Sequence, residues 1–539
     1  MKKSFLGLIV FVMIILSLVG CSKGNGNEVV ESKESEVNEE SEKVLTMAIG
    51  SEPDQGFDPV YGWGRYGSPL IQSTLVETNV DMEIVNDLAT SYNITEDGLT
   101  WTFNLRQDAY FTDGEQVTAH DVVFTYENAK ASNSIVDLTI MDSIVAIDDF
   151  TVEFKLVKPE STFIYSIAKT GIVPEHKYDD TYGDNPIGSG PFKFVQWDKG
   201  QQLILEANEE YYGKVPEIKK VVILFMTEDA AMVAAKTGQL DVAMTVPSLT
   251  TVEFEGMTLL NTDTVDNRGI TLPVVPNEGL TTKEGYQIGN DVTSDISIRK
   301  ALSYGLNREQ MVEDVLNGYG KPAYTECDNM PWFNEESIVN YDLDKAKGIL
   351  DEAGWIDANN DGIREKANLN AEFTIIYAAG DSVRQGLALN ASEQAKELGI
   401  SIQVEGLSWD EIDKRMFRDA VLMGWGDQTP METYLLYNTS NKGVDYYNPE
   451  NYSNVIVDNY MEEALTTTDS DKANELWKKA QWDGTTGTST LGDAPWVWLV
   501  NIDHLYYIKD SLDVGEQKIH PHGHAWPLVS NLRDWKWIK

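Results

Sequence analysis

The chain is poor in cysteine. Cys21 and Cys327 are the only two among 539 residues. If Cys21 is modified at the N-terminus, as argued below, Cys327 has no intramolecular partner and the fold contains no disulfide. The core must then stabilise the protein, and Cys327 is expected to be a small buried residue or an unreactive thiol.

Basic residues are also scarce, with 42 Lys and Arg against 87 Asp and Glu, so the formal net charge is −45. Nucleic-acid partners are excluded on this ground, because binding to phosphates requires clustered Lys and Arg. The acidic balance favours solubility and repels anionic surfaces. It says little about the charge of a ligand.

The sequence contains none of the common catalytic patterns. There is no GxSxG elbow, no P-loop, no HExxH, and no GxGxxG after a strand. Neighbouring carboxylates are uninformative in a chain with 87 acidic residues. We therefore expect that the protein is not an enzyme, and an extracytoplasmic enzyme such as a lipoprotein peptidase is the disfavoured alternative.

Only one long apolar run is present, from Phe5 to Val19, and it follows Lys2 and Lys3. This is the layout of a secretory signal peptide over residues 1–20. The run ends in "LVGC", which resembles the bacterial lipobox, so Cys21 is expected to carry lipid. A retained N-terminal membrane anchor is the alternative, and in both cases the body of the protein lies outside the cytoplasm. No later run reaches 18 apolar residues, so no second membrane span is expected.

The segment after Cys21 is rich in Glu, Ser, Lys, Asn and Gly, and Val is its only large apolar residue type. Such a composition cannot bury enough surface to offset the entropy of ordering. Residues 21–43 are therefore predicted to be a disordered acidic tether. Its expected reach, on the order of 25 Å, suits a domain held away from a membrane surface.

The remaining residues are globular by composition and interleave strand and helix patterns. Residues 44–49 and 100–106 alternate apolar and polar side chains, as half-buried strands do. Thr118 precedes an apolar helical face and is a predicted N-cap. Helices are predicted after residue 290, with strand 371–379 among them, over 295–318, 342–354, 382–398 and 455–482. Blocks of both kinds predict a mixed α/β protein in several lobes.

Four stretches in a fixed order resemble the family 5 extracellular solute-binding proteins, the peptide and nickel receptors of ABC importers. They are "WTFNLRQDAYFTDGEQVTAHDVVFTYENA" (101–129), "NPIGSGPFKFVQWDKGQQLILEANEEYYGKVPEIKKVVI" (185–223), "DISIRKALSYGLNREQMVEDVLNGYGKPA" (295–323) and "DLDKAKGILDEAGW" (342–355). The resemblance extends from about residue 44 to the C-terminus.

This resemblance implies an α/β fold of the type II periplasmic-binding-protein kind with three lobes. Two α/β lobes, I and III, would close by a hinge around a ligand, and lobe II would be additional. Lobe I is expected over 44–83, 187–271 and 502–539, lobe II over 84–186, and lobe III over 272–501.

The same resemblance suggests where the ligand binds. "VLMGWGDQTP" (421–430) is similar to the pocket strand of the family, in which a Trp precedes an Asp that pairs with the amino terminus of a peptide. Trp425 and Asp427 match these residues, although they stand one position closer together than in the classical oligopeptide receptors. The alternative is a buried Trp and an Asp that caps a turn.

Further candidates lie on a Gly-rich loop, "VYGWGRYGSP" (60–69), where lobe I of the family lines the pocket. Enclosing a peptide requires aromatic walls, a carboxylate for its ammonium and a cation for its carboxylate. The loop supplies Trp63, Arg65 and Tyr66, with packing of a surface loop as the alternative. Additional cations that could pair with a carboxylate are Arg268 and Arg418, which otherwise are solvated structural arginines.

Two segments raise the possibility of a metal. In 357–368, Asp357, Asp361 and Gly362 fit the start of an EF-hand loop, but Asn368 stands where a bidentate Glu is expected. A polar turn is therefore favoured over calcium, and no resident cofactor is expected.

The other segment is "HPHGHAW", which holds three of the six histidines, His520, His522 and His524. Alternate positions on an extended chain share one face and would suit Ni²⁺, Cu²⁺ or Zn²⁺. Pro521 and Gly523 break a regular strand, so packing against lobe I is the competing interpretation.

Together these features predict a lipid-anchored substrate-binding protein of an ABC importer that captures di- or oligopeptides and delivers them to the membrane permease. A receptor for nickel or a metal chelate is the alternative of the same class. We expect a monomer on the extracellular face of the cell membrane, at a Gram-positive-like surface rather than in a periplasm.

Overall fold

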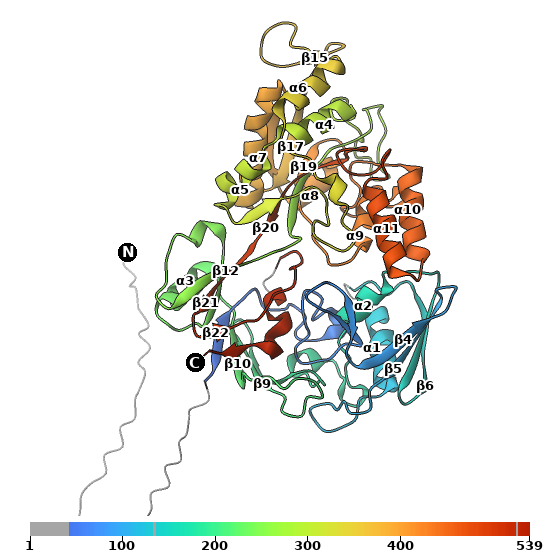
Figure 1. The fold of residues 1–539 in the computed structure, drawn as a ribbon, viewed down its shortest axis with the longest axis vertical. Helices are drawn as coiled ribbons and strands as arrows, with labels where there is room; N and C mark the ends of the chain where they lie inside the picture. The colour runs from blue at the N-terminus through green and yellow to red at the C-terminus, as the bar shows by residue number, and fades with distance from the viewer. Residues whose placement is uncertain (1–42, 133–135, 524–525, 539) are drawn as a thin grey trace, which may run out of the picture. The chain divides into compact units, whose positions relative to one another are not determined.

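The computed structural model describes residues 43–132, 136–523 and 526–538 (Figure 1). The predicted signal peptide, Cys21, the tether up to residue 42 and His524 lie outside the described residues. Within residues 43–539 the strands form three larger sheets, and helices pack against each of them.

The first sheet has seven strands in the order β12-β21-β11-β1-β10-β9-β8. Its central strand β1 is parallel to β10 and to β11, as the crossover helix α3 between them requires. The elements are β1 (Leu45–Ala48), β8 (Phe192–Asp198), β9 (Gln202–Ala207), β10 (Lys220–Leu224), α3 (Glu228–Lys236), β11 (Val242–Thr245), β12 (Met257–Thr262) and β21 (His504–Lys509). The predicted strands in 44–49 and 185–223 are confirmed.

The second sheet is antiparallel and has four strands in the order β4-β5-β7-β6. Its elements are β4 (Ala89–Ile94), β5 (Thr100–Leu105), β6 (Met141–Asp148) and β7 (Thr151–Leu156), with helices α1 (Ala119–Ala131) and α2 (Phe163–Lys169). The predicted N-cap is confirmed: the Thr118 N–H donates to the Asp121 carboxylate at 2.9 Å.

The third sheet has six strands in the order β14-β20-β13-β19-β17-β18. They are β13 (Asn267–Thr271), β14 (Gly320–Pro322), β17 (Glu372–Ala378), β18 (Ser401–Leu407), β19 (Ala420–Met423) and β20 (Trp496–Ile502). The surrounding helices are α4 (Ile296–Gly305), α5 (Arg308–Leu316), α6 (Leu343–Glu352), α7 (Ser382–Ala395), α8 (Trp409–Arg415), α9 (Met431–Tyr437), α10 (Val455–Thr466) and α11 (Ser470–Gln481).

Two stretches predicted as single helices are each two helices. In 295–318 the helix breaks before Asn307, whose side chain accepts from the Gln310 N–H and starts α5. In 455–482, the Asp469 side chain accepts from the Lys472 N–H and starts α11. A residue that caps a new helix inside an apolar periodic pattern explains both differences.

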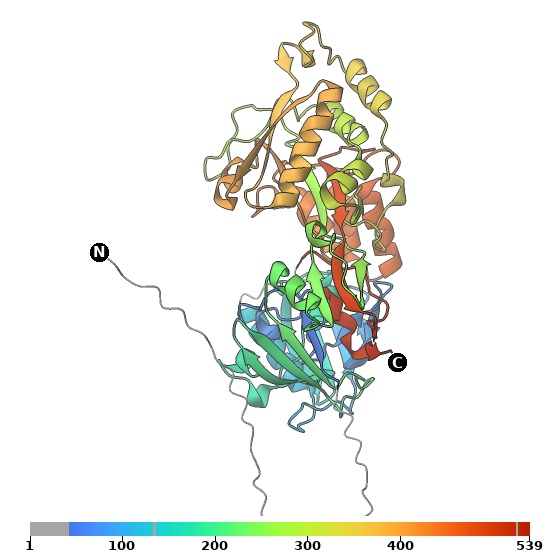
Figure 2. The same cartoon turned by 90° about the vertical axis from the view of Figure 1, so that its left-hand side faces the viewer.

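The chain passes between the seven-stranded and six-stranded sheets at two places. One is the segment 263–266 between β12 and β13, and the other is Asp503 between β20 and β21. Figure 1 shows β20 and β21 following each other from one sheet into the other, and Figure 2 shows the same run from the side. The C-terminal segment returns here, where His520 forms a parallel bridge with Thr264. Lobe I was expected to extend to residue 271, but β13, which ends there, pairs in the six-stranded sheet. The lobe boundaries stay predictions.

Cys327 is buried among apolar side chains that include Trp332 and Met330. Burial raises the pKa of its thiol well above the ordinary value. Within the described residues, no helix combines the length and apolar character needed to cross a membrane.

A buried carboxyl makes the stability of the fold depend on pH. Burial raises the pKa of Glu450 from 4.5 to about 8, although its Oε1 accepts a hydrogen bond from Trp496 Nε1 at 3.0 Å. Between pH 4.5 and 8 the folded protein keeps a proton that the unfolded chain has released, so this group lowers stability as the pH rises. We predict that Glu450→Gln melts like wild type at pH 5 and is more stable at pH 8, by on the order of 3 kcal/mol. Thermal unfolding at the two pH values tests this, and an equal difference at both would contradict it.

Candidate functional site

The chain turns sharply where β19 ends. Gly426 has φ 144°, and a Cβ built on it would lie 2.1 Å from the Val265 carbonyl oxygen, so the turn requires glycine. The Gly426 and Asp427 N–H groups donate to the two oxygens of Glu432 at 2.8 and 3.1 Å. Burial, and secondly the charge of Asp427, raise the pKa of Glu432 well above the ordinary value. The buried carboxyl group thus fixes the direction in which Asp427 leaves the strand.

Trp425 supplies an aromatic surface beside this turn. Its ring stacks on Tyr447 with 4.8 Å between centroids and 23° between planes. The Trp425 Nε1 is buried and has no hydrogen-bond partner among the described residues. The pair forms a partly buried aromatic surface next to Asp427.

Asp427 is 45% exposed, and its Oδ1 lies 2.5 Å from the Lys169 Nζ at the end of α2. Its Oδ1 also accepts from the Gln428 N–H. In this structure the Asp427 carboxylate thus pairs with the ammonium of Lys169, and its role towards a ligand stays a prediction.

The glycine-rich loop contributes in two different ways. Trp63 is only 8% exposed, its indole donates to the Pro69 carbonyl at 2.7 Å, and it makes edge contacts with neighbouring rings. It thus packs mainly in the core. Arg65 lies over the ring of Tyr66 and donates to its hydroxyl at 2.6 Å. Burial raises the pKa of Tyr66, and the positive charge of Arg65 lowers it again. The negative charge of Asp427 also raises the pKa of Tyr66, so Asp427 is close enough to influence it.

Neither of the other two candidate arginines is free to pair with a ligand. Arg268 is buried, with Nη1 2.5 Å from Asp266 Oδ1. Burial alone would raise the pKa of Asp266, but Arg268 and His522 hold it well below its ordinary range. Arg418 is exposed, pairs with Asp419, and precedes β19 at the end opposite Trp425, so the structure does not bring it to the other candidates.

The described histidines of "HPHGH" do not share one set of partners. His520 is fully buried, and its Nδ1 lies 3.2 Å from Thr262 Oγ1 and from His504 Nδ1. Burial lowers its pKa well below the ordinary value. His522 is 36% exposed, its Nδ1 lies 2.6 Å from Asp266 Oδ1, and its N–H donates to the Gly426 carbonyl. This arrangement favours packing for His520 and leaves His522 beside the turn.

Among the described residues, only one group of His, Cys, Asp and Glu side chains places its ligand atoms within 4.8 Å of one another. It consists of Asp357, Asp361 and Glu365 in the loop weighed for calcium. Asp357 accepts from the Gly362 N–H, and Asp361 accepts from the Ile363 N–H. The polar-turn interpretation accounts for these hydrogen bonds.

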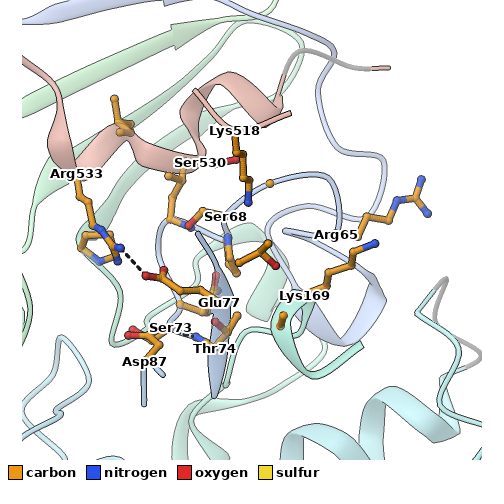
Figure 3. Close-up of a pocket in the computed structure, with 18 of the residues that line it drawn as sticks. Arg65, Ser68, Ser73, Thr74, Glu77, Asp87, Lys169, Lys518, Ser530 and Arg533 are labelled. Atoms are coloured by element: carbon orange, nitrogen blue, oxygen red, sulfur yellow. Dashed lines mark hydrogen bonds and ion pairs between the residues drawn. The ribbon is translucent and has the colours of Figure 1, made fainter. Parts of the chain in front are cut away.

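A cavity of about 50 Å³ adjoins Asp427 through Lys169 and Gln428 (Figure 3). It is lined by the loop after Arg65, by α2 and by the C-terminal segment, and its charged or hydroxyl side chains are Arg65, Ser68, Ser73, Thr74, Glu77, Thr78, Asp87, Tyr165, Lys169, Tyr211, Lys518, Ser530 and Arg533. A second cavity of about 230 Å³ lies over the loop itself and is lined by 51–56, 61–68 and Trp526.

The pairs inside the smaller cavity are specific. Arg533 Nη2 lies 2.6 Å from Glu77 Oε1, and the Tyr212 hydroxyl donates to Asp87 at 2.5 Å. Burial, and secondly the charge of Glu77, raise the pKa of Asp87 to about 6. Sequence reasoning missed Lys169 and Lys518, because no motif marks a lone lysine and only the fold brings these two together at the cavity beside Asp427.

Comparison with known proteins gives the context for this geometry. The sequence model for bacterial extracellular solute-binding proteins, family 5 Middle, matches residues 83–447. The chain belongs to this family. Family 5 proteins are solute receptors of ABC importers and not enzymes, which agrees with the expected class and sets the peptidase alternative aside.

Relatives and solved structures agree with the assignment to family 5. Protein XP55 of Streptomyces lividans is 32% identical over 493 residues, covering 88% of this chain and 86% of that protein. The oligopeptide-binding protein AppA of Bacillus subtilis is 27% identical over 500 residues, covering 87% and 89%.

NikZ of Campylobacter jejuni, solved with Ni(L-His), superposes with a TM-score of 0.71 at 25% identity, covering 92% of this chain and 99% of that one. These findings confirm the expected α/β, type II periplasmic-binding-protein fold.

The geometry of the turn predicts that Gly426 is indispensable. Gly426→Ala places a methyl group against the Val265 carbonyl and should destabilise the protein by more than about 2 kcal/mol and disturb Asp427. Gly484→Ala is the control, since Gly484 also has positive φ (94°) but nothing within 4 Å of its Cβ; it should cost about 1 kcal/mol. Urea unfolding measures both, and equal losses would show that the contact with Val265 is unimportant.

Proposed function

We propose that this family 5 receptor captures di- or oligopeptides and delivers them to the membrane permease of an ABC importer. The observation that carries the proposal is the exposed carboxylate of Asp427, which already binds one ammonium, that of Lys169. The aromatic pair beside it and the Arg65–Tyr66 pair, whose tyrosine is influenced by the charge of Asp427, supply an apolar wall and a cation. These are the groups that a zwitterionic chain with an amino terminus needs.

The ion pair between Lys169 and Asp427 suggests how such a ligand is exchanged. The amino terminus of a peptide would replace the lysine ammonium at Asp427, so the carboxylate stays paired throughout. Lys169 lines the cavity and would then be available to an anionic group of the ligand. This exchange avoids leaving a desolvated carboxylate without a partner, which would be costly.

The names of relatives are consistent with peptides. Among them are the oligopeptide-binding protein of Bacillus subtilis, a probable D,D-dipeptide-binding protein of Escherichia coli and a glutathione-binding protein of Pectobacterium atrosepticum. Each of these is named for a ligand with peptide or peptide-like bonds.

A receptor for nickel or a metal chelate is the second candidate. It is favoured by His522, a partly exposed imidazole beside Gly426, and by the likeness to NikZ with its Ni(L-His) ligand. The metal or chelate would be cargo here, and no resident cofactor is proposed.

The peptide proposal predicts that Asp427 recognises a free amino terminus. Asp427→Asn should bind a tripeptide about tenfold more weakly, because the charge-assisted hydrogen bond to the ammonium is lost. It should bind the N-acetylated tripeptide as weakly as wild type does. The control Asp410→Asn removes one exposed carboxylate from the start of α8 and should leave both affinities unchanged. Calorimetry at pH 7 gives the dissociation constants.

The same calorimetry separates the two candidates. If no peptide binds but nickel with L-histidine does, and His522→Ala abolishes that binding while the exposed His120→Ala retains it, the chelate receptor replaces the peptide receptor. Equal affinity of wild type for free and acetylated peptide would show that Asp427 has another role.

We propose that Cys21 is the lipidated first residue of the mature protein, which is then anchored at the extracellular face of the cell membrane. The support is the "LVGC" sequence and the polar segment that follows it. In this arrangement the receptor is held close to the permease and acts as a monomer at a Gram-positive-like surface. Because the anchor is covalent, it does not depend on any membrane-spanning helix.

Cys21→Ala should therefore abolish maturation and partitioning into the detergent phase. The control Ser22→Ala keeps the cysteine and should be processed and partition as wild type does. Phase separation of whole-cell protein followed by immunoblotting measures both properties. An unchanged size and distribution of Cys21→Ala would exclude the lipid anchor.

A further inference from the structure

The cavity beside Asp427 contains a lysine that forms no ion pair with the described residues. Lys518 is half-buried and, among the residues that the structure describes, has no hydrogen-bond or ion-pair partner. Each of the other three cations has a specific partner: Arg533 pairs with Glu77, Lys169 pairs with Asp427, and Arg65 donates to the Tyr66 hydroxyl. An unpaired ammonium in a partly buried cavity is costly, so its presence calls for an explanation.

The charge balance of the cavity is opposite to that of the chain. Its lining includes four cationic side chains, those of Arg65, Lys169, Lys518 and Arg533, and two carboxylic side chains. The whole chain has about twice as many acidic as basic residues. Burial lowers the pKa of Lys518 to about 8; Glu77 opposes this, while Lys169 and Arg533 lower it further. At neutral pH the lysine thus remains protonated and lacks a counter-ion.

Hydroxyl side chains line the same cavity as this ammonium. Figure 3 labels Ser68 and Ser530 together with Lys518 among its lining residues. The Ser68 oxygen accepts from the Leu70 N–H at 3.1 Å, so its own O–H remains available to donate. Lys518 and Ser68 together offer a charged and a neutral donor to one small anion. A volume of about 50 Å³ suits a carboxylate group and is too small for a large ligand.

The position of the cavity relative to Asp427 indicates which carboxylate would enter. Lys169 connects Asp427 with the cavity, because its ammonium pairs with Asp427 and its side chain lines the cavity. A ligand whose ammonium replaces that of Lys169 therefore places its first side chain at the mouth of the cavity. In a glutamate residue, two methylenes separate the carboxylate from the carbon that bears the ammonium.

We propose that this cavity is a subsite for an acidic side chain at the first residue of the bound peptide, with Lys518 and Ser68 as its donors. The inference rests on the proposed peptide function and adds a substrate preference to it. Binding would give Lys518 the counter-ion that the protein itself does not provide, while Glu77 stays neutralised by Arg533.

Isosteric peptide pairs test the preference. We expect wild type to bind Glu-Gly-Gly about tenfold more tightly than Gln-Gly-Gly at pH 7, because a charge-assisted hydrogen bond is gained. Gly-Gly-Glu and Gly-Gly-Gln move the same change to the last residue and should differ by less than twofold. Calorimetry supplies the four dissociation constants.

Variants then assign the preference to the lysine. Lys518→Met should abolish the preference, so that Glu-Gly-Gly and Gln-Gly-Gly bind with constants within about twofold of each other, whereas Lys518→Arg should retain it. The matched control is Lys219→Met, which removes one positive charge that pairs with Glu209 outside the cavity, and it should keep the full preference. Lys518→Met should also melt at a higher temperature than wild type, since an unpaired cation is removed.

The outcomes separate the inference from the proposed function. Tight binding of Glu-Gly-Gly and Gln-Gly-Gly with equal constants would overturn the acidic subsite and leave the peptide receptor intact. A preference that Lys518→Met retains would overturn the role of the lysine. Absence of binding of all four peptides would overturn the peptide function and the subsite with it. The wild-type comparison stands even if a variant fails to fold.

Discussion

The buried carboxylate of Asp266 joins the segments that meet between the two larger sheets. It lies just before β13, and its oxygens face Arg268, His504 at the start of β21, and His522 from the C-terminal segment. Because the group is buried and ionised, loss of a partner leaves an uncompensated charge, which typically costs about 3–5 kcal/mol. The C-terminal segment in turn contacts Gly426 through the His522 N–H. The turn that presents Asp427 is thus held both by this ion cluster, through His522, and by the Glu432 carboxyl group.

The surroundings of Asp427 show how an acidic protein neutralises its few cations. Arg533 is held by Glu77, Arg268 by Asp266, and Lys169 by Asp427, so most positive charge near the site is already neutralised. Of these three pairs, the one with Asp427 has the most exposed carboxylate, 45% against 34% for Glu77 and 7% for Asp266, so it can be opened at the lowest cost. Selectivity then depends on which charges the protein leaves without partners.

The local elements were predictable from the sequence because their signals are local. Alternation identified β5, and Thr118 identified the start of α1. The turn at Trp425–Asp427 was found only through the family resemblance. Lys518 could not be found, since its importance arises from neighbours hundreds of residues away in sequence, such as Glu77 and Lys169. Trp63 was misleading for a related reason: a Trp on a Gly-rich loop has the same sequence signal whether it packs inward or faces a ligand.

Cys327 has a practical consequence. It is the one cysteine in the part of the chain that the structure describes, and its buried thiol, with a pKa raised well above the ordinary value, reacts slowly with alkylating reagents. Cysteines introduced on the surfaces of the seven-stranded and six-stranded sheets can therefore be labelled with fluorophores while the native thiol stays unmodified. Energy transfer between such dyes would report the separation of the two sheets in single molecules, with the wild-type core left intact.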